Sequence, residues 1–110
     1  MRYSNIFSRL FHATRYSLEG LYYALKHEQA FQYEFIVFVI VSLIGKSLLF
    51  SGAWLIVMCL ELINSSVEKA FDLIDKNFRD EIKAGKDMLS SAIFLAICFN
   101  IILWGYAIII

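Results

Sequence analysis

Four polar residues, Glu61, Asn64, Glu68 and Asp72, interrupt a stretch of the sequence that is otherwise rich in apolar residues. At 100° per residue along an α-helix, they fall on one face about 80° wide, and we call them the polar stripe. Neighbouring carboxylates can bind Mg²⁺ where phosphates supply further ligands. A carboxylate in an apolar setting can also act as a general base. The two roles together indicate phosphoryl transfer at a membrane surface, and the residues alone leave proton conduction open.

The polar stripe is difficult to explain as a purely structural feature. A charge near the centre of a bilayer costs at least ~2.5–3.5 kcal/mol on insertion scales, whereas an interhelical hydrogen bond contributes only roughly 0.6 kcal/mol. Glu61, the deepest acid, is the hardest to attribute to packing, so we predict a functional site. The sequence lacks a glycine-rich Walker loop and the catalytic-loop and DFG patterns of protein kinases. This excludes the mechanisms of soluble kinases.

The composition of the chain predicts an integral membrane protein. Of its 110 residues, 60% are hydrophobic, against about 45–50% in a soluble domain, and the mean hydropathy is +0.66. Proline is absent, so long helices are permitted. The net charge is zero, which provides no reason to expect a nucleic-acid partner. The length favours a single domain over residues 1–110.

The elements that must position the polar stripe are predicted to be helices. Residues 1–30 mix charges with aromatic residues, and their apolar positions recur at spacings of three and four, which is typical of an amphipathic helix lying in the membrane interface. Three apolar segments follow, and we expect transmembrane helices at about 31–49, 53–73 and 91–110. A tight turn around Ser51 and Gly52 is expected to join the first two. The predicted fold is therefore an all-α membrane protein.

The distribution of lysine and arginine predicts the orientation of these segments. The first 30 residues hold four such residues, the stretch from Lys69 to Lys86 holds five, and Lys46 alone lies between the first two spans. Positive residues accumulate on the cytoplasmic side of a membrane. The N-terminus and the expected loop at 74–90 should therefore face the cytoplasm, and the C-terminus should lie outside.

Three segments of the chain resemble the signature elements of one known family. "ELINSSVEKAFD", 61–72, resembles the E-x-x-N-[ST]-x-[VI]-E-x-x-x-D signature of the prokaryotic diacylglycerol kinase family, which also includes undecaprenol kinases. "YSLEGLYYALKHEQAFQYE", 16–34, is similar to the N-terminal elements of that family. "AGKDMLSSA", 84–92, is similar to its A-K-D-x-x-S-A element. The three segments lie in the family's order, so the resemblance extends over nearly the whole chain.

The resemblance implies a small homotrimeric lipid kinase of the bacterial inner membrane. Such enzymes transfer the γ-phosphate of MgATP to a lipid hydroxyl, at composite active sites between subunits on the cytoplasmic face. Diacylglycerol is the leading acceptor, which would give phosphatidic acid, and undecaprenol is the alternative within the family. The alternative of another class is a non-enzymatic membrane subunit, either proton-conducting or an assembly factor, that uses the same acidic stripe.

The resemblance also implies roles for the acidic residues and Asn64. By its place in the motif, Glu61 corresponds to the general base that accepts the proton of the lipid hydroxyl, and Asn64 would orient groups around the reacting phosphoryl. Glu28 and Glu68 correspond to the carboxylates that hold Mg²⁺ on the ATP phosphates. Asp72 matches an acidic position of the family whose role the resemblance leaves open.

Further residues match the family's nucleotide and lipid positions. The nucleotide-contacting positions correspond to Arg9, Tyr16, Lys86 and Asp87, and the lipid-binding positions to Glu34 and Ser90. The element around Lys86 usually carries a basic residue two positions earlier and a small residue three positions later, where this chain has Ala84 and Leu89. An arginine common in the family directly after the acidic position of Asp72 is replaced by Leu73. These departures concern the detailed nucleotide contacts and leave the polar stripe intact.

Overall fold

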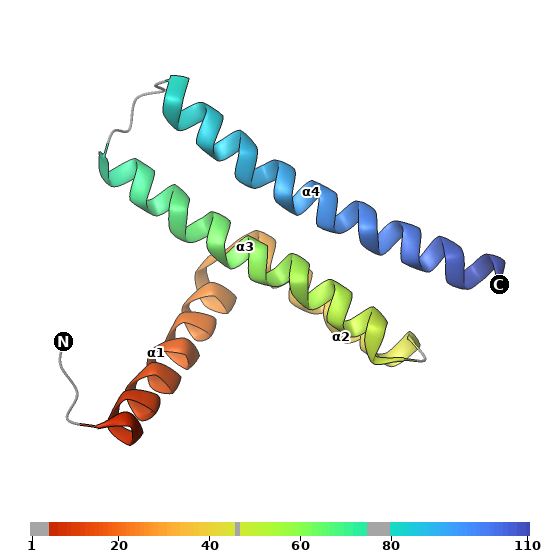
Figure 1. Cartoon of the computed structure of the whole chain (residues 1–110), viewed down its shortest axis with the longest axis horizontal. Helices are drawn as coiled ribbons and strands as arrows, with labels where there is room; N and C mark the ends of the chain where they lie inside the picture. The colour runs from red at the N-terminus through yellow and green to blue at the C-terminus, as the bar shows by residue number, and fades with distance from the viewer. Residues whose placement is uncertain (1–4, 46, 75–79) are drawn as a thin grey trace.

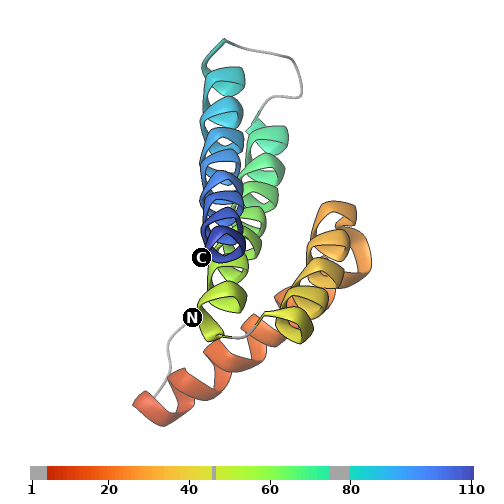
Figure 2. The ribbon, with the colours of Figure 1, turned by 90° about the vertical axis from the view of Figure 1, so that its right-hand side faces the viewer.

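A computed structural model describes residues 5–45, 47–74 and 80–110. The described chain is helical, and its four helices are α1 (Ile6–His27), α2 (Gln29–Ile44), α3 (Leu48–Ile74) and α4 (Asp80–Ile109). Figures 1 and 2 both show α4 running alongside α3 in the opposite direction, whereas α1 projects away from the other helices. The expected all-α class is confirmed for this part of the chain.

Helices α1 and α2 are separated by a single residue, Glu28, whose backbone is extended (φ −103°, ψ 106°). The break retains its hydrogen bonds, because the Glu28 amide donates to the Ala24 carbonyl at 2.9 Å. The side chain of Gln32 donates to the last carbonyls of α1, those of Leu25 at 2.9 Å and Lys26 at 3.2 Å. These bonds satisfy carbonyls that a helix end otherwise leaves unpaired. The junction therefore holds Glu28 in a defined position at the corner between two helices.

The connection between α2 and α3 lies earlier than the sequence predicted. Ser51 and Gly52 belong to helix α3, so the expected turn there is wrong: α2 ends at Ile44 and α3 begins at Leu48. A side chain at Gly45 would approach the Val41 carbonyl oxygen to 2.8 Å, so this position requires glycine. Within the helix, the Ser51 hydroxyl pairs with that of Ser42 across the α2–α3 contact at 3.0 Å.

Two of the helices are long and apolar enough to cross a membrane, α3 with 27 residues and α4 with 30. Helix α2 is apolar but has only 16 residues, so it spans about 24 Å, short of the hydrocarbon thickness of about 30 Å. Within the described ranges the structure therefore provides two candidate spans, where the sequence predicted three. A third crossing through α2 remains a proposal.

Helix α4 begins much earlier than the predicted third span. It starts at Asp80, so the part of the expected 74–90 loop from residue 80 onward is helical, and residues 75–79 lie outside the described ranges. Asp80 and Glu81 stand in its first turn, where acidic side chains interact favourably with the helix dipole. Gly85 allows this end of α4 to pack closely on α3, because a Cβ there would meet the Phe71 ring at 3.0 Å.

Helix α4 carries a buried polar residue at its contact with α3, Asn100, which is 4% exposed. Its amide donates to the carbonyl of Ala53 on α3 at 3.1 Å and to that of Ala96 on its own helix at 2.8 Å. The side chain therefore ties the two helices together through the backbone. No role for Asn100 was predicted from the sequence.

Replacing Asn100 by alanine should destabilise the protein by about 1 kcal/mol, because interhelical polar contacts in membranes contribute roughly 0.6 and at most about 1.7 kcal/mol. Unfolding in mixed micelles, followed by circular dichroism, measures the change. The control is Ile101→Ala, since Ile101 is 65% exposed on the same helix. Equal stability of Asn100→Ala and the wild type would show that Asn100 does not stabilise the contact between α3 and α4.

Candidate active site

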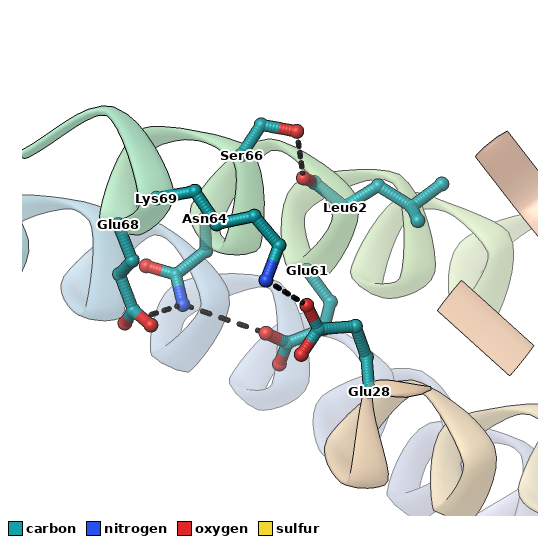
Figure 3. Close-up of polar contacts among 7 residues, drawn as sticks. All are labelled: Glu28, Glu61, Leu62, Asn64, Ser66, Glu68 and Lys69. Atoms are coloured by element: carbon teal, nitrogen blue, oxygen red, sulfur yellow. Dashed lines mark hydrogen bonds and ion pairs between the residues drawn. The ribbon is translucent and has the colours of Figure 1, made fainter. Parts of the chain in front are cut away.

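The structure places the polar stripe along one face of α3, with its members increasingly exposed toward the end of the helix. Glu61 and Asn64 are buried, at 9% and 8% exposure, Glu68 is half-buried and Asp72 is exposed. The Asn64 amide donates to both neighbouring acids, to Glu68 Oε1 at 3.1 Å and to Glu61 Oε2 at 3.4 Å (Figure 3). Asn64 thereby links the two carboxylates and limits the positions that each can adopt.

Glu28 approaches the polar stripe from the α1–α2 corner. Its carboxylate is 23% exposed and forms an ion pair with Lys69 of α3, with 2.8 Å between Oε1 and Nζ (Figure 3). The same ammonium lies 5.5 Å from the centre of the Tyr23 ring on α1, within the range of a cation–π contact. Glu28 thus contacts α3 through Lys69, the residue that directly follows Glu68.

Glu34 reaches the stripe from α2. Its carboxyl group interacts with that of Glu61, and its carbonyl oxygen accepts a hydrogen bond of 2.8 Å from the indole of Trp54 on α3. This bond fixes the α2 backbone against α3 beside Glu61. Acids from the α1–α2 corner, from α2 and from α3 therefore gather in one region.

Lys86 and Asp87, which fall in the loop predicted at 74–90, lie near the start of α4. Lys86 pairs with Asp72 of the stripe at 3.3 Å, and Asp87 pairs with Lys83 one turn away at 2.7 Å. Ser90 is exposed one turn further along the helix. The Lys86–Asp72 contact brings two sequence-predicted site residues together across the α3–α4 interface, at the end of α3 nearest Glu68.

Arg9 and Tyr16 occupy a different part of the molecule. They lie on α1, which extends away from α3 (Figure 1), and they line an apolar pocket of about 430 Å³ together with Leu10 and Ala13. Within one chain the structure does not place them beside the polar stripe. A nucleotide that contacts both regions would therefore need α1 from another copy of the chain or a different position of α1.

The side chains present fit a divalent cation whose ligand set is incomplete in the protein. Among the described residues, no group of three His, Cys, Asp or Glu side chains could hold a metal ion. The carboxamide oxygen of Asn64, however, is buried and has no hydrogen-bond partner within the described chain, while the amide nitrogen of the same side chain donates to the two acids. Carboxylate and amide oxygens are the ligands that Mg²⁺ prefers, and Mg²⁺ commonly takes only one or two carboxylates from a protein alongside substrate phosphates.

Lys69 was not predicted from the sequence to be a site residue. It was counted only among the cytoplasmic positive charges, although it directly follows Glu68. At 100° per residue, Lys69 lies about 80° from Glu61 around the helix, so it borders the polar stripe. The signal that could have identified Lys69 from the sequence is a basic residue at the border of an acidic face on an otherwise apolar helix. Its partner Glu28 is distant in sequence, and only the fold reveals the pairing.

The fold and the site define a small α-helical membrane protein with a cluster of acids between its helices. The model of the prokaryotic diacylglycerol kinase family matches residues 15–108. The diacylglycerol kinase of Haemophilus influenzae is 36% identical over 89% of this chain and 90% of its own. That of Helicobacter pylori strain J99 is 40% identical over 90% of this chain and 84% of its own. That of Escherichia coli K12 is 33% identical over 89% and 87%, respectively.

These similarities extend over most of the chain and of its relatives. The chain therefore belongs to the prokaryotic diacylglycerol kinase family and is an enzyme of the kinase class. The family expected from the three sequence segments is confirmed.

Proposed function

We propose that the protein transfers the γ-phosphate of MgATP to the hydroxyl group of diacylglycerol, giving ADP and phosphatidic acid. The observation that carries the proposal is the chain of contacts from Glu61 through Asn64 to Glu68. It joins a buried carboxylate to a half-buried one along a single helix face. The two acids are seven positions apart on the helix, which places their backbone positions about 10 Å apart along the axis. A lipid hydroxyl can thus approach from the apolar end of this helix face, at Glu61, and the phosphates of ATP from its more hydrated end, at Glu68.

Each residue has one task in this proposal. Glu61 accepts the proton of the lipid hydroxyl as its oxygen attacks the γ-phosphorus, and the bond to the β-phosphate oxygen breaks, leaving ADP. Glu28 and Glu68 would hold Mg²⁺, which neutralises phosphate charge when bound. Asn64 positions both carboxylates through its amide. Lys86 offsets phosphate charge as a point cation, and Asp72 holds that ammonium at 3.3 Å.

Four further parts of the proposal rest on the family resemblance and on the charge distribution. The protein lies in the bacterial inner membrane, its N-terminus and active site face the cytoplasm, and α2 forms a third crossing. Three copies assemble into a homotrimer with composite sites. The exposure of Arg9 and Tyr16 on a projecting α1 supports the composite site, because these residues lie away from the stripe of their own chain.

One assay tests the reaction. Purified protein in mixed micelles receives labelled ATP, Mg²⁺ and either diacylglycerol or undecaprenol, and label in the lipid fraction is measured. Label in phosphatidic acid is expected. Faster transfer to undecaprenol would reassign the acceptor, and no transfer to either lipid by folded protein would defeat the kinase reaction in favour of a non-enzymatic role.

The composite site leads to a prediction about mixed assemblies. Arg9→Ala and Glu61→Gln should each be inactive alone, but co-assembled trimers should recover up to about a quarter of wild-type activity, because a quarter of the sites draw each intact residue from a different subunit. Mixing the two variants after unfolding, and refolding them together, measures the recovery. Each variant refolded alone is the control. Absence of recovery would place Arg9 and Glu61 in a site within one subunit.

A further inference from the structure

The ammonium group of Lys69 forms an ion pair with the carboxylate of Glu28, one of the two acids proposed to hold Mg²⁺. Its Nζ lies 2.8 Å from Glu28 Oε1 (Figure 3). A metal ion that binds this carboxylate must therefore compete with Lys69 or displace it. The pair is asymmetric, because the lysine side chain is 55% exposed and the glutamate 23%. The flexible, more exposed partner is the one able to move.

The surroundings of Lys69 provide space for such a movement. A pocket of about 230 Å³ lies between α1 and α3, and its lining includes Lys69, Glu28, Tyr23 and Ser65. Its volume accommodates several water molecules. The ammonium already lies 5.5 Å from the centre of the Tyr23 ring, so this favourable contact need not be lost when the ion pair with Glu28 opens. Because the Lys69 side chain is 55% exposed, its ammonium can leave Glu28 and remain in contact with solvent.

The position of Lys69 in the sequence also places it beside the proposed phosphate site. It directly follows Glu68, the second proposed metal ligand, on the same helix. A nucleotide whose phosphates share a metal ion with Glu28 and Glu68 brings negative charge within reach of this long, flexible side chain. A lysine ammonium interacts with phosphate as a compact point charge.

We infer that Lys69 holds Glu28 in the metal-free enzyme and transfers to the nucleotide phosphates when the metal ion takes that carboxylate. The inference rests on the proposed function, because it requires that Glu28 binds the metal ion. Lys69 is then a positioning residue with two opposed effects. It weakens binding of the metal ion alone and strengthens binding of the metal–nucleotide complex, so that the two ligands are favoured together over the free ion.

The test compares Lys69→Met, which keeps the length of the side chain but removes its charge, with the wild type in detergent. Binding of Mn²⁺ alone, measured by electron paramagnetic resonance, should tighten by up to about fivefold, the most expected of a partly exposed ion pair. The KM for MgATP should rise by about fivefold, with kcat changed less than KM. Lys69→Arg retains a cation and should stay within about twofold of the wild type in both measurements.

A matched control is Lys26→Met, because Lys26 also contacts a tyrosine ring on α1, at 5.7 Å, and its loss changes the net charge equally. Weaker or unchanged Mn²⁺ binding in Lys69→Met would overturn the inference and leave Lys69 a tether between α1 and α3. Tighter Mn²⁺ binding in Lys26→Met as well would also overturn it in favour of a general charge effect. Unchanged Mn²⁺ binding in Glu28→Gln would instead defeat the proposed metal site, which separates the two failures.

Discussion

Replacing Glu61 by glutamine should lower kcat by about 10²–10⁴-fold, the usual contribution of a positioned general base. Glutamine has nearly the same shape but takes up no proton. Its side-chain oxygen can still accept the hydrogen bond that Asn64 donates to Glu61 Oε2 at 3.4 Å. The link from Asn64 to Glu68 should therefore persist, and nucleotide binding should remain largely unchanged. The loss should appear in turnover.

The measurement combines the mixed-micelle assay with direct binding of MgATP to the variant. Glu19→Gln is the matched control, because Glu19 is an exposed acid on α1 paired with Arg15 at 3.1 Å, and it should retain wild-type kcat. Turnover close to that of the wild type in Glu61→Gln would remove Glu61 from the role of base. An equal loss of nucleotide binding would assign it to the nucleotide site.

The polar stripe shows what helical periodicity can predict. The positions of Glu61, Asn64 and Glu68 on one face follow from 100° per residue, and the structure brings them into hydrogen-bonded contact. The same rule holds along any single helix. The sequence could therefore predict the arrangement within α3, whereas residues contributed by other helices required the fold or the resemblance to a family.

The boundaries of the helices were less predictable. Serine and glycine favour turns as a pair, so Ser51 and Gly52 indicated the α2–α3 turn, yet both lie within α3. The hydroxyl bond from Ser51 to Ser42 of the facing helix is a tertiary contact that no local rule contains. The early start of α4 at Asp80 has a similar origin, since hydropathy identifies the apolar part of a helix and not a polar extension beyond it.

The pairing of Lys69 with Glu28 is the clearest case of a contact outside the reach of sequence patterns. Each residue alone is typical of a solvated surface. Their contact depends on the extended backbone at Glu28, which turns α1 away from α2 and directs the acid toward α3. Sequence reasoning recovered Glu28 only because its flanking residues resemble a family element, and that element says nothing about Lys69.

Replacing Glu68 by glutamine should raise the Mg²⁺ concentration needed for half-maximal activity by at least about tenfold, since even outer-shell partners of metal ligands are worth about 10–100-fold in affinity. Glutamine keeps an oxygen for the Asn64 amide, now 3.1 Å from Glu68 Oε1, so helix α3 and the position of Asn64 should be preserved. The variant should therefore lose charge at the metal site and little else.

The decisive measurement is a Mg²⁺ titration of both activity and ATP binding for Glu68→Gln, with Glu19→Gln as the control for loss of an acid elsewhere. Excess Mg²⁺ should restore part of the Glu68→Gln activity, because Glu28 and the phosphates remain as ligands. The same excess should leave Glu61→Gln inactive, since that variant lacks the base. An unchanged Mg²⁺ dependence in Glu68→Gln would exclude Glu68 from the metal site. Rescue of Glu61→Gln by Mg²⁺ would assign Glu61 to the metal site instead of the role of base, because the lost activity would then come from lost charge and not from lost proton transfer.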